Sequence, residues 1–258
     1  MVEAQDIVVF LGPTLKRAEA SAILPATYLP PAEQGSIVRA CQAHRPKALV
    51  LIDGVFGSVP AVRHKEILWA CSNGVAVFGA ASIGAIRAAE LTAIGMQGHG
   101  FIYRWYAQTP LADDDEVAVA MTPSELGAEP LSEALISMRL TLRRACREHV
   151  LSCEQGKALE ERARATPFVE RSYGRLIGDA RQAFPHWAEA LGRLERWLPG
   201  RAIDQKRADA ISLLTRLAQA PDIPAPRHTP PAFRMTEAWA HDLAADGLWD
   251  RKTGGPCS

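Results

Sequence analysis

The chain has 258 residues, of which 48% are hydrophobic and 22% are charged, a composition ordinary for a globular protein. Its 29 lysines and arginines balance its 29 aspartates and glutamates, so the overall charge gives no reason to expect nucleic-acid or membrane binding. Five cysteines without a C-x-x-C pair indicate neither a disulfide framework nor a thiolate zinc site. We therefore expect one large domain, or a domain with an appendage, in a reducing compartment.

The opening stretch, MVEAQDIVVF, carries acidic side chains where a signal peptide has a basic region. No apolar run reaches the ~20 residues needed to span a bilayer. The sequence therefore predicts a cytoplasmic protein without a membrane segment.

Over residues 1–125, short apolar runs alternate with helical patterns, which indicates α/β units around a mostly parallel sheet with flanking helices. The expected strands are 7–11, 27–29 (a weak signal), 48–53 and 75–79. The expected helices are 14–24, 35–45, 59–72 and 83–94. Each strong strand ends in a polar or glycine-rich break. Because the carboxyl ends of parallel strands meet at one edge, these breaks are expected to border one cleft.

From residue 130 onward the pattern is helical. Residues 131–258 carry four more basic than acidic side chains, and residues 1–130 carry the reverse excess. This basic second half either meets an acidic partner or forms solvated helix faces. The helical spacing places one set of residues on an apolar face and three arginines on another. The apolar set is Leu131, Leu135, Met138, Leu142 and Ala145, and the arginines are Arg139, Arg143 and Arg147.

The predicted fold class is α/β in the N-terminal half, followed by an all-helical C-terminal region. The predicted segments are an α/β core at 1–125, a helical region packed on it at 126–219, a proline-rich connector at 220–231, and a C-terminal helix and tail at 232–258.

Ser82 lies in the stretch VFGAASIGAIRAAEL, between an apolar strand and a segment rich in helix formers. This order is similar to the nucleophile elbow of hydrolases, although A-A-S-I-G lacks the first glycine of G-x-S-x-G. An ordinary N-cap serine accounts for the same position, because its oxygen would accept a hydrogen bond from the first turn. Both interpretations stay open from this stretch alone.

Lys65 lies in the preceding helical segment, on the side it shares with Ala61, Val62, Leu68 and Trp69. Burial lowers the pKa of an amine, so an inward lysine is a candidate general base for a serine. The alternatives are a lysine that extends its charge past apolar neighbours, or one paired with Glu66 or Asp53. Adjacent helical positions differ by roughly 100°, so His64 and Glu66 do not readily share a metal ion.

Two further stretches have competing interpretations. Asp113, Asp114, Asp115 and Glu116 either hold Mg²⁺ or form an acidic turn that is solvated or faces a partner. The stretch FLGPTLKRAEA places helix N-terminal amides near Thr14, where an anion could bind, but lacks a nucleotide-binding fingerprint. We expect no resident metal and no cofactor.

Six separated strings together resemble the TfuA family over about residues 6–150. They are FLGPTL, YLPPAEQGS, LVLIDGVF, HKEIL, GVAVFGAASIGAIRAAEL and DDDEVAVAM, in that order. Two positions depart from the usual family pattern: Ser36 stands where an aspartate is usual, and Ile83 where methionine is common.

The resemblance implies an accessory hydrolase of peptide-backbone thioamidation in the biosynthesis of modified ribosomal peptides. Such a protein releases sulfide from a thiocarboxylated ThiS-like sulfur carrier and helps a partner YcaO enzyme to engage its peptide substrate. ATP is used by that partner, not by this chain. By resemblance, Ser82 and Lys65 are the catalytic serine-lysine pair.

The family motifs also imply residues that line the site or bind substrate: Thr14, Asp53, His64, Ile83, Gly84, Arg87 and Glu90. The amides of Ile83 and Gly84 are candidate donors to an oxyanion, and Arg87 is expected either to pair with Glu90 or to hold the tail of the carrier. Asp53 is a candidate to orient Lys65. The alternative function is a non-catalytic adaptor that docks the YcaO enzyme and its peptide, in which Ser82 is a helix cap.

Overall fold

The computed structural model describes residues 4–57, 59–109, 112–225, 232–250 and 255–256. The chain divides into two units. The first combines residues 1–110 with residues 209–258, and the second is residues 111–208. The predicted boundaries at residues 125 and 219 stay predictions.

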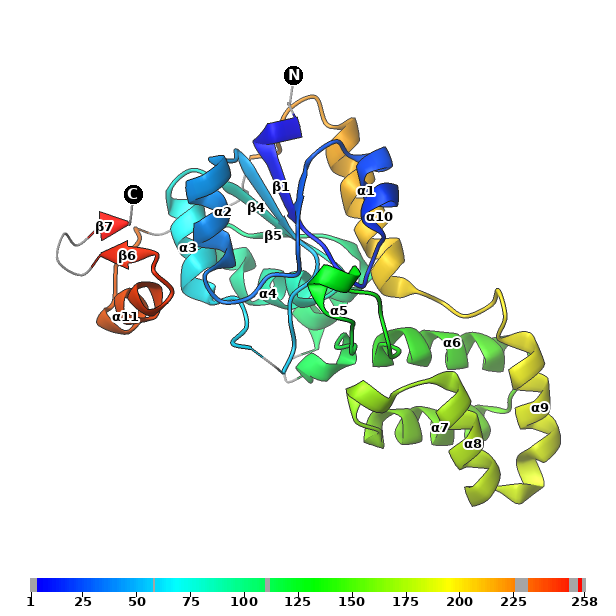
Figure 1. Ribbon diagram of the computed structural model, residues 1–258. Coiled ribbons are helices and arrows are strands. Elements are labelled where there is room, and N and C mark those ends of the chain that lie inside the picture. The colour runs from blue at the N-terminus through cyan, green and yellow to red at the C-terminus, as the bar shows by residue number, and fades with distance from the viewer. Residues whose placement is uncertain (1–3, 58, 110–111, 226–231, 251–254, 257–258) are drawn as a thin grey trace. The chain divides into compact units, whose positions relative to one another are not determined.

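A five-stranded parallel sheet forms the centre of the first unit (Figure 1). Its strands are β1 (Ile7–Phe10), β2 (Thr27–Leu29), β3 (Ala48–Leu51), β4 (Ala76–Gly79) and β5 (Gln97–Gly98). They lie in the order β2-β1-β3-β4-β5. Ile7 pairs with Ala48 and Ala48 with Ala76, so the three central strands begin and end in line.

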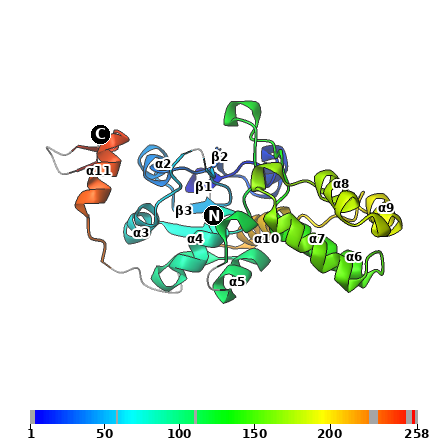
Figure 2. The same cartoon turned by 90° about the horizontal axis from the view of Figure 1, so that it is seen from below.

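Every residue of the three central strands is buried, because helices cover both faces of the sheet. The helices of this α/β part are α1 (Arg17–Ile23), α2 (Ser36–His44), α3 (His64–Ser72), α4 (Ile83–Leu91) and α5 (Gly100–Gln108). Helix α1 covers one face together with α10 (Gln205–Gln219), whose Leu213, Leu214 and Leu217 join the core there. Helices α2 and α3 lie on the opposite face (Figures 1 and 2).

These elements confirm the predicted α/β class and all four predicted strands. Helix α3 was expected from residue 59 but begins at His64, because the Glu66 carboxylate accepts the Arg63 amide and closes the first turn there. β5 was not predicted, since Gln97–Gly98 has two residues and no apolar run.

The second unit is helical over its larger part. Its helices are α6 (Leu135–Arg147), α7 (Cys153–Ala165), α8 (Tyr173–Ala183) and α9 (Ala188–Trp197). Leu135, Met138, Leu142 and Ala145 form the apolar face of α6, as predicted. Leu131 was wrongly included in that face, because it precedes the helix and is 65% exposed.

The C-terminal stretch of the first unit contains α11 (Glu237–Ala245) and an antiparallel pair of short strands, β6 (Trp249–Asp250) and β7 (Gly255–Pro256). Trp239, Leu243 and Leu248 pack with Val38 of α2, and Trp69 of α3 joins them. Residues 226–231 of the predicted proline-rich connector lie outside the described residues. None of the helices described has the length and apolar character needed to cross a membrane.

Candidate functional site

The segments that follow the three central strands lie at one edge of the sheet, as predicted. β1, β3 and β4 are neighbours, and Gly12-Pro13-Thr14, Asp53 and Ser82 follow them in turn. In a doubly wound sheet of this order, the direction of winding reverses between β1 and β3. Ligands of such folds bind outside the carboxyl ends of the strands near this reversal.

Asp53 and Thr14 meet across that reversal point. The Thr14 hydroxyl donates to Asp53 Oδ1 over 2.6 Å, and the amides of Gly12 and Thr14 donate to Oδ2 over 2.9 and 3.1 Å. Both side chains are buried, and Asp53 is fully inaccessible to solvent. The amides of Gly12 and Thr14 already serve this carboxylate, so the anion that the sequence allowed near Thr14 gains no support. The expectation that Asp53 orients Lys65 gains no support, since Asp53 holds the β1 to α1 turn instead.

Ser82 is the N-cap residue of α4, but its side chain makes no cap hydrogen bond. The side chain is nearly inaccessible, at 1% exposure. Its amide donates to the Ala80 carbonyl oxygen over 2.8 Å, across Ala81 at φ 67°. A tight turn with a positive φ at a residue that has a Cβ is strained, and such strain gathers at functional sites. The simple cap interpretation therefore loses the hydrogen bond that defines it.

Small residues around Ser82 are required by close packing of backbone. A Cβ on Gly84 would overlap the Leu51 carbonyl oxygen at the end of β3, and a Cβ on Gly79 would overlap the Gly84 carbonyl oxygen. These glycines let the first turn of α4 lie directly against the ends of β3 and β4. Ala80 and Ala81 are themselves fully buried.

The two amides predicted to face an oxyanion differ in availability. The Gly84 amide points to the Ile52 carbonyl oxygen at 3.4 Å. Among the described residues, the Ile83 amide has no backbone partner. As a first-turn donor of α4 beside Ser82, it is the better placed of the two to bind a developing negative charge.

Lys65 is half-buried and does not lie on the inward face of α3, which is formed by Glu66, Ile67, Ala70 and Cys71. The predicted inward orientation of Lys65 is therefore wrong. The ammonium donates to the Arg234 carbonyl oxygen over 3.2 Å and lies 5.3 Å from the centre of the Phe233 ring. Within the described residues, no hydrogen bond joins Lys65 to Ser82.

Phe233 and Arg234 were not singled out by the sequence analysis. They lie almost 170 residues after Lys65, in a stretch that carried only an amphipathic signal. Nothing in their local pattern indicates a contact with α3.

His64, Arg87 and Glu90 form one polar group between α3 and α4. Glu90 Oε2 lies 2.7 Å from His64 Nε2 and 2.7 Å from an Arg87 nitrogen, which confirms the expected pairing of Arg87 with Glu90. Arg87 also donates to the Val62 carbonyl oxygen. Burial by itself would raise the pKa of Glu90, but the hydrogen bonds from His64 and Arg87 outweigh it and lower that pKa. Glu90 is thus held as an anion that joins the two helices.

Acidic side chains of residues 113–116 form ion pairs within the second unit. Asp113 pairs with Arg164, Asp115 with the buried Arg171, and Glu116 with Arg139. In the part of the chain that the structure describes, no group of three or more potential ligands is arranged to hold a metal ion. Three members of this acidic run therefore act as ion-pair partners for arginines of the second unit.

Several other arginines of the second half also form ion pairs. Arg143, Arg175, Arg181 and Arg193 each pair with a nearby acidic side chain, as does Arg144. The interpretation as solvated, ion-paired helix faces therefore fits better than a free basic surface.

The fold and the edge residues define a doubly wound α/β protein with a buried serine where β4 passes into α4. Residues 53–172 match the family model described as TfuA-like protein, so the chain is similar to that family over this stretch. The matched stretch contains Ser82 and Lys65 but neither Thr14 nor the residues that contact Lys65 from the C-terminal stretch. No curated protein sequence matches the chain.

Proposed function

We propose that this protein is a TfuA-like hydrolase that releases sulfide from a thiocarboxylated ThiS-like carrier protein. The sulfide would supply a partner YcaO enzyme, which uses ATP to convert peptide amides to thioamides. This chain would also help that partner to engage its peptide. It would need neither a metal nor a cofactor of its own.

The observation that carries the proposal is the environment of Ser82. A hydroxyl that is nearly buried, makes no cap hydrogen bond and follows a strained turn at the sheet edge fits a nucleophile better than a structural cap. The unpartnered Ile83 amide and the N-terminus of α4 supply positive potential beside it.

In the proposed reaction, Ser82 Oγ attacks the terminal carbon of the thiocarboxylate and gives its proton to a neutral Lys65 amine. The tetrahedral oxyanion is stabilised by the Ile83 amide. The carbon–sulfur bond then breaks, and sulfide leaves with the proton that Lys65 returns. A water molecule hydrolyses the acyl ester on Ser82, which restores the hydroxyl and frees the carrier carboxylate. Lys65 has to leave the Arg234 carbonyl for this sequence to run.

One observation favours the adaptor function as a second candidate. Lys65 contacts the Arg234 carbonyl oxygen and the Phe233 ring, and these contacts do not place the amine against Ser82. An adaptor for the YcaO enzyme and its peptide needs no neutral lysine.

The test is sulfide release from a thiocarboxylated carrier, measured for the wild type, Ser82→Ala and Lys65→Ala. Ser21→Ala, an exposed serine on α1, is the matched control. Loss of about 10³-fold or more in both site variants, with Ser21→Ala unchanged, is the expected result. Circular dichroism checks that each variant is folded.

Binding of the YcaO partner is measured in the same set of proteins. If wild type and both site variants bind the partner equally and none releases sulfide, the adaptor function replaces the hydrolase. Release that persists in folded Ser82→Ala excludes the serine as nucleophile.

A further inference from the structure

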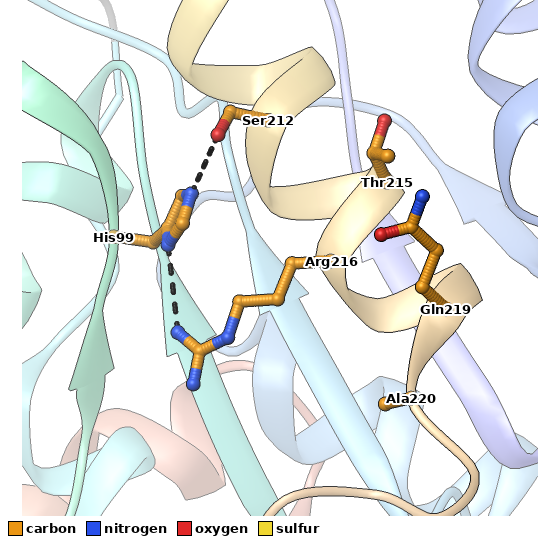
Figure 3. A pocket seen from close by; sticks show the side chains of 6 residues that line it. All are labelled: His99, Ser212, Thr215, Arg216, Gln219 and Ala220. Carbon is orange, nitrogen blue, oxygen red and sulfur yellow. Dashed lines mark hydrogen bonds between the residues drawn. The ribbon is translucent and has the colours of Figure 1, made fainter.

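A polar pocket lies in the first unit, between the residue that follows β5 and one side of α10 (Figure 3). Its volume is about 510 Å³. The residues that line it are His99, Ser212, Thr215, Arg216, Gln219 and Ala220. None of them belongs to the site around Ser82, and all lie outside the stretch that matches the family model, except His99.

The hydrogen bonds in this pocket determine which His99 ring nitrogen carries the proton. Arg216 can only donate, so its contact of 3.4 Å with His99 Nδ1 makes that nitrogen the acceptor. The His99 proton therefore resides on Nε2, which donates to Ser212 Oγ over 2.8 Å. The Ser212 hydroxyl proton is then not used by His99 and is available to the pocket.

The lining residues include no carboxylate. In the described chain, Arg216 has no acidic partner. Asp209, which lies one turn before Ser212 on α10, accepts the amides of Phe101 and Ile102 over 2.9 and 2.7 Å and so caps α5. The pocket therefore presents a guanidinium with hydroxyl and amide donors, and its local charge is positive.

The state of His99 agrees with this charge. Burial lowers the pKa of the imidazole, Arg216 and Arg104 lower it further, and Asp209 offsets them in part. His99 is neutral at neutral pH and serves as a positioned bridge between Arg216 and Ser212. An anion beside Arg216 would offset the guanidinium charge and so raise the pKa of His99.

We propose that this pocket binds a small molecule through a carboxylate or phosphate group, with Arg216 as the charged contact and Ser212 and Thr215 as hydroxyl donors. Guanidinium groups bind both kinds of oxyanion through paired N–H donors. The proposal uses no residue of the sulfide-release site and is independent of that function.

The first experiment titrates the full-length protein with inorganic phosphate and, separately, with acetate, and follows the His99 imidazole by NMR. The His99 signals are identified from the spectrum of His99→Gln. At least one anion is expected to bind saturably and to raise the His99 pKa. Tighter binding of phosphate identifies a phosphoryl ligand, and tighter binding of acetate a carboxylate.

Two arginine variants separate direct contact from long-range charge. Arg216→Ala is expected to weaken binding about tenfold or more, the effect of losing one charged hydrogen bond. Arg104→Ala removes the same charge from an exposed residue that does not line the pocket, and is expected to change binding less than about threefold. Ser212→Ala is a second pocket variant that leaves the charge intact and is expected to weaken binding by a smaller factor.

The proposal is overturned if neither anion produces a saturable change at His99. It is also overturned if folded Arg216→Ala binds as tightly as the wild type, or if Arg104→Ala loses as much affinity as Arg216→Ala.

Discussion

Thr14 and Asp53 connect two turns that are 39 residues apart in the sequence. A buried carboxylate is tolerated because three donors from one turn surround it. The pair fixes the β1 to α1 turn at the point where a doubly wound sheet reverses, and so shapes the rim of the candidate site.

Thr14→Val tests the strength of this connection with little change of shape. The variant leaves Asp53 Oδ1 without its hydroxyl donor, so we expect unfolding free energy to fall by about 1.5–3 kcal/mol. Urea unfolding followed by circular dichroism measures the change. Ser21→Ala, whose hydroxyl is exposed and bonds only within its own helix, is expected to stay within about 0.5 kcal/mol. Equal stability of Thr14→Val and the wild type would contradict a stabilising role for the 2.6 Å hydrogen bond.

At this scale the sequence indicated which residues lie at the sheet edge but not which of them touch. Thr14 with Asp53 and Arg87 with Glu90 were selected from motifs, and the structure brings each pair together. Lys65 was misplaced because its inward side was defined partly by Ala61 and Val62, which lie before the start of α3. With α3 starting at His64, the buried carboxylate is Glu66, which accepts the amides of Gly35 and Ile37 from α2.

The contact of α4 with the ends of β3 and β4 requires glycine, which has no side chain, at positions 79 and 84. Gly84 has an ordinary helical φ, so alanine there is excluded by the Leu51 carbonyl and not by backbone conformation. The position of Ser82 at the sheet edge follows from this contact.

Gly84→Ala is expected to lower the free energy of unfolding by at least about 3 kcal/mol, because a Cβ cannot move a backbone carbonyl of the central strand without strain. Gly178→Ala is the matched change in α8, where an added Cβ meets nothing within 4 Å. That variant is expected to raise stability by about 0.5–1 kcal/mol, since alanine favours helix. Chemical unfolding of both proteins tests the prediction, and similar effects of the two substitutions would show that the tight contact is not limiting.

Helices and strands were predicted correctly where a short stretch of sequence carries the pattern by itself. β1, β3 and β4 are continuous apolar runs that end in glycine or aspartate, and their buried pairing was expected from that pattern. The turn at Ala81 carried no such signal, because alanine rarely adopts a positive φ and only the surrounding contacts hold it there.

For the whole molecule, residues 232–248 change the interpretation of Lys65. Trp239 is nearly buried, and its ring lies 5.1 Å from Phe233 and 6.5 Å from Trp69. Arg63 and Asp242 add an ion pair at 3.4 Å. This apolar contact holds Phe233 and Arg234 in place, and these two residues contact the Lys65 ammonium.

Trp239→Ala is therefore expected to free Lys65. Acetylation of Lys65 by an activated ester, followed by mass spectrometry, should become about tenfold faster, as expected from losing one hydrogen bond and one cation–π contact. Lys157, exposed on α7, is the internal control and should react at the same rate in both proteins. An unchanged rate at Lys65 would contradict the idea that the C-terminal stretch restrains it.

The order of segments in the first unit sets the timing of its completion during synthesis. One face of its sheet is covered by Leu213, Leu214 and Leu217 of α10, and α5 is capped by Asp209. Both lie beyond residues 111–208, which form a unit continuous in the chain. The chain leaves the ribosome from its N-terminus. The second unit, residues 111–208, is therefore completely synthesised before the first unit, which also needs residues 209–258. The part of this sheet face that α10 covers stays open until α10 emerges, so the nascent chain exposes apolar surface at this stage.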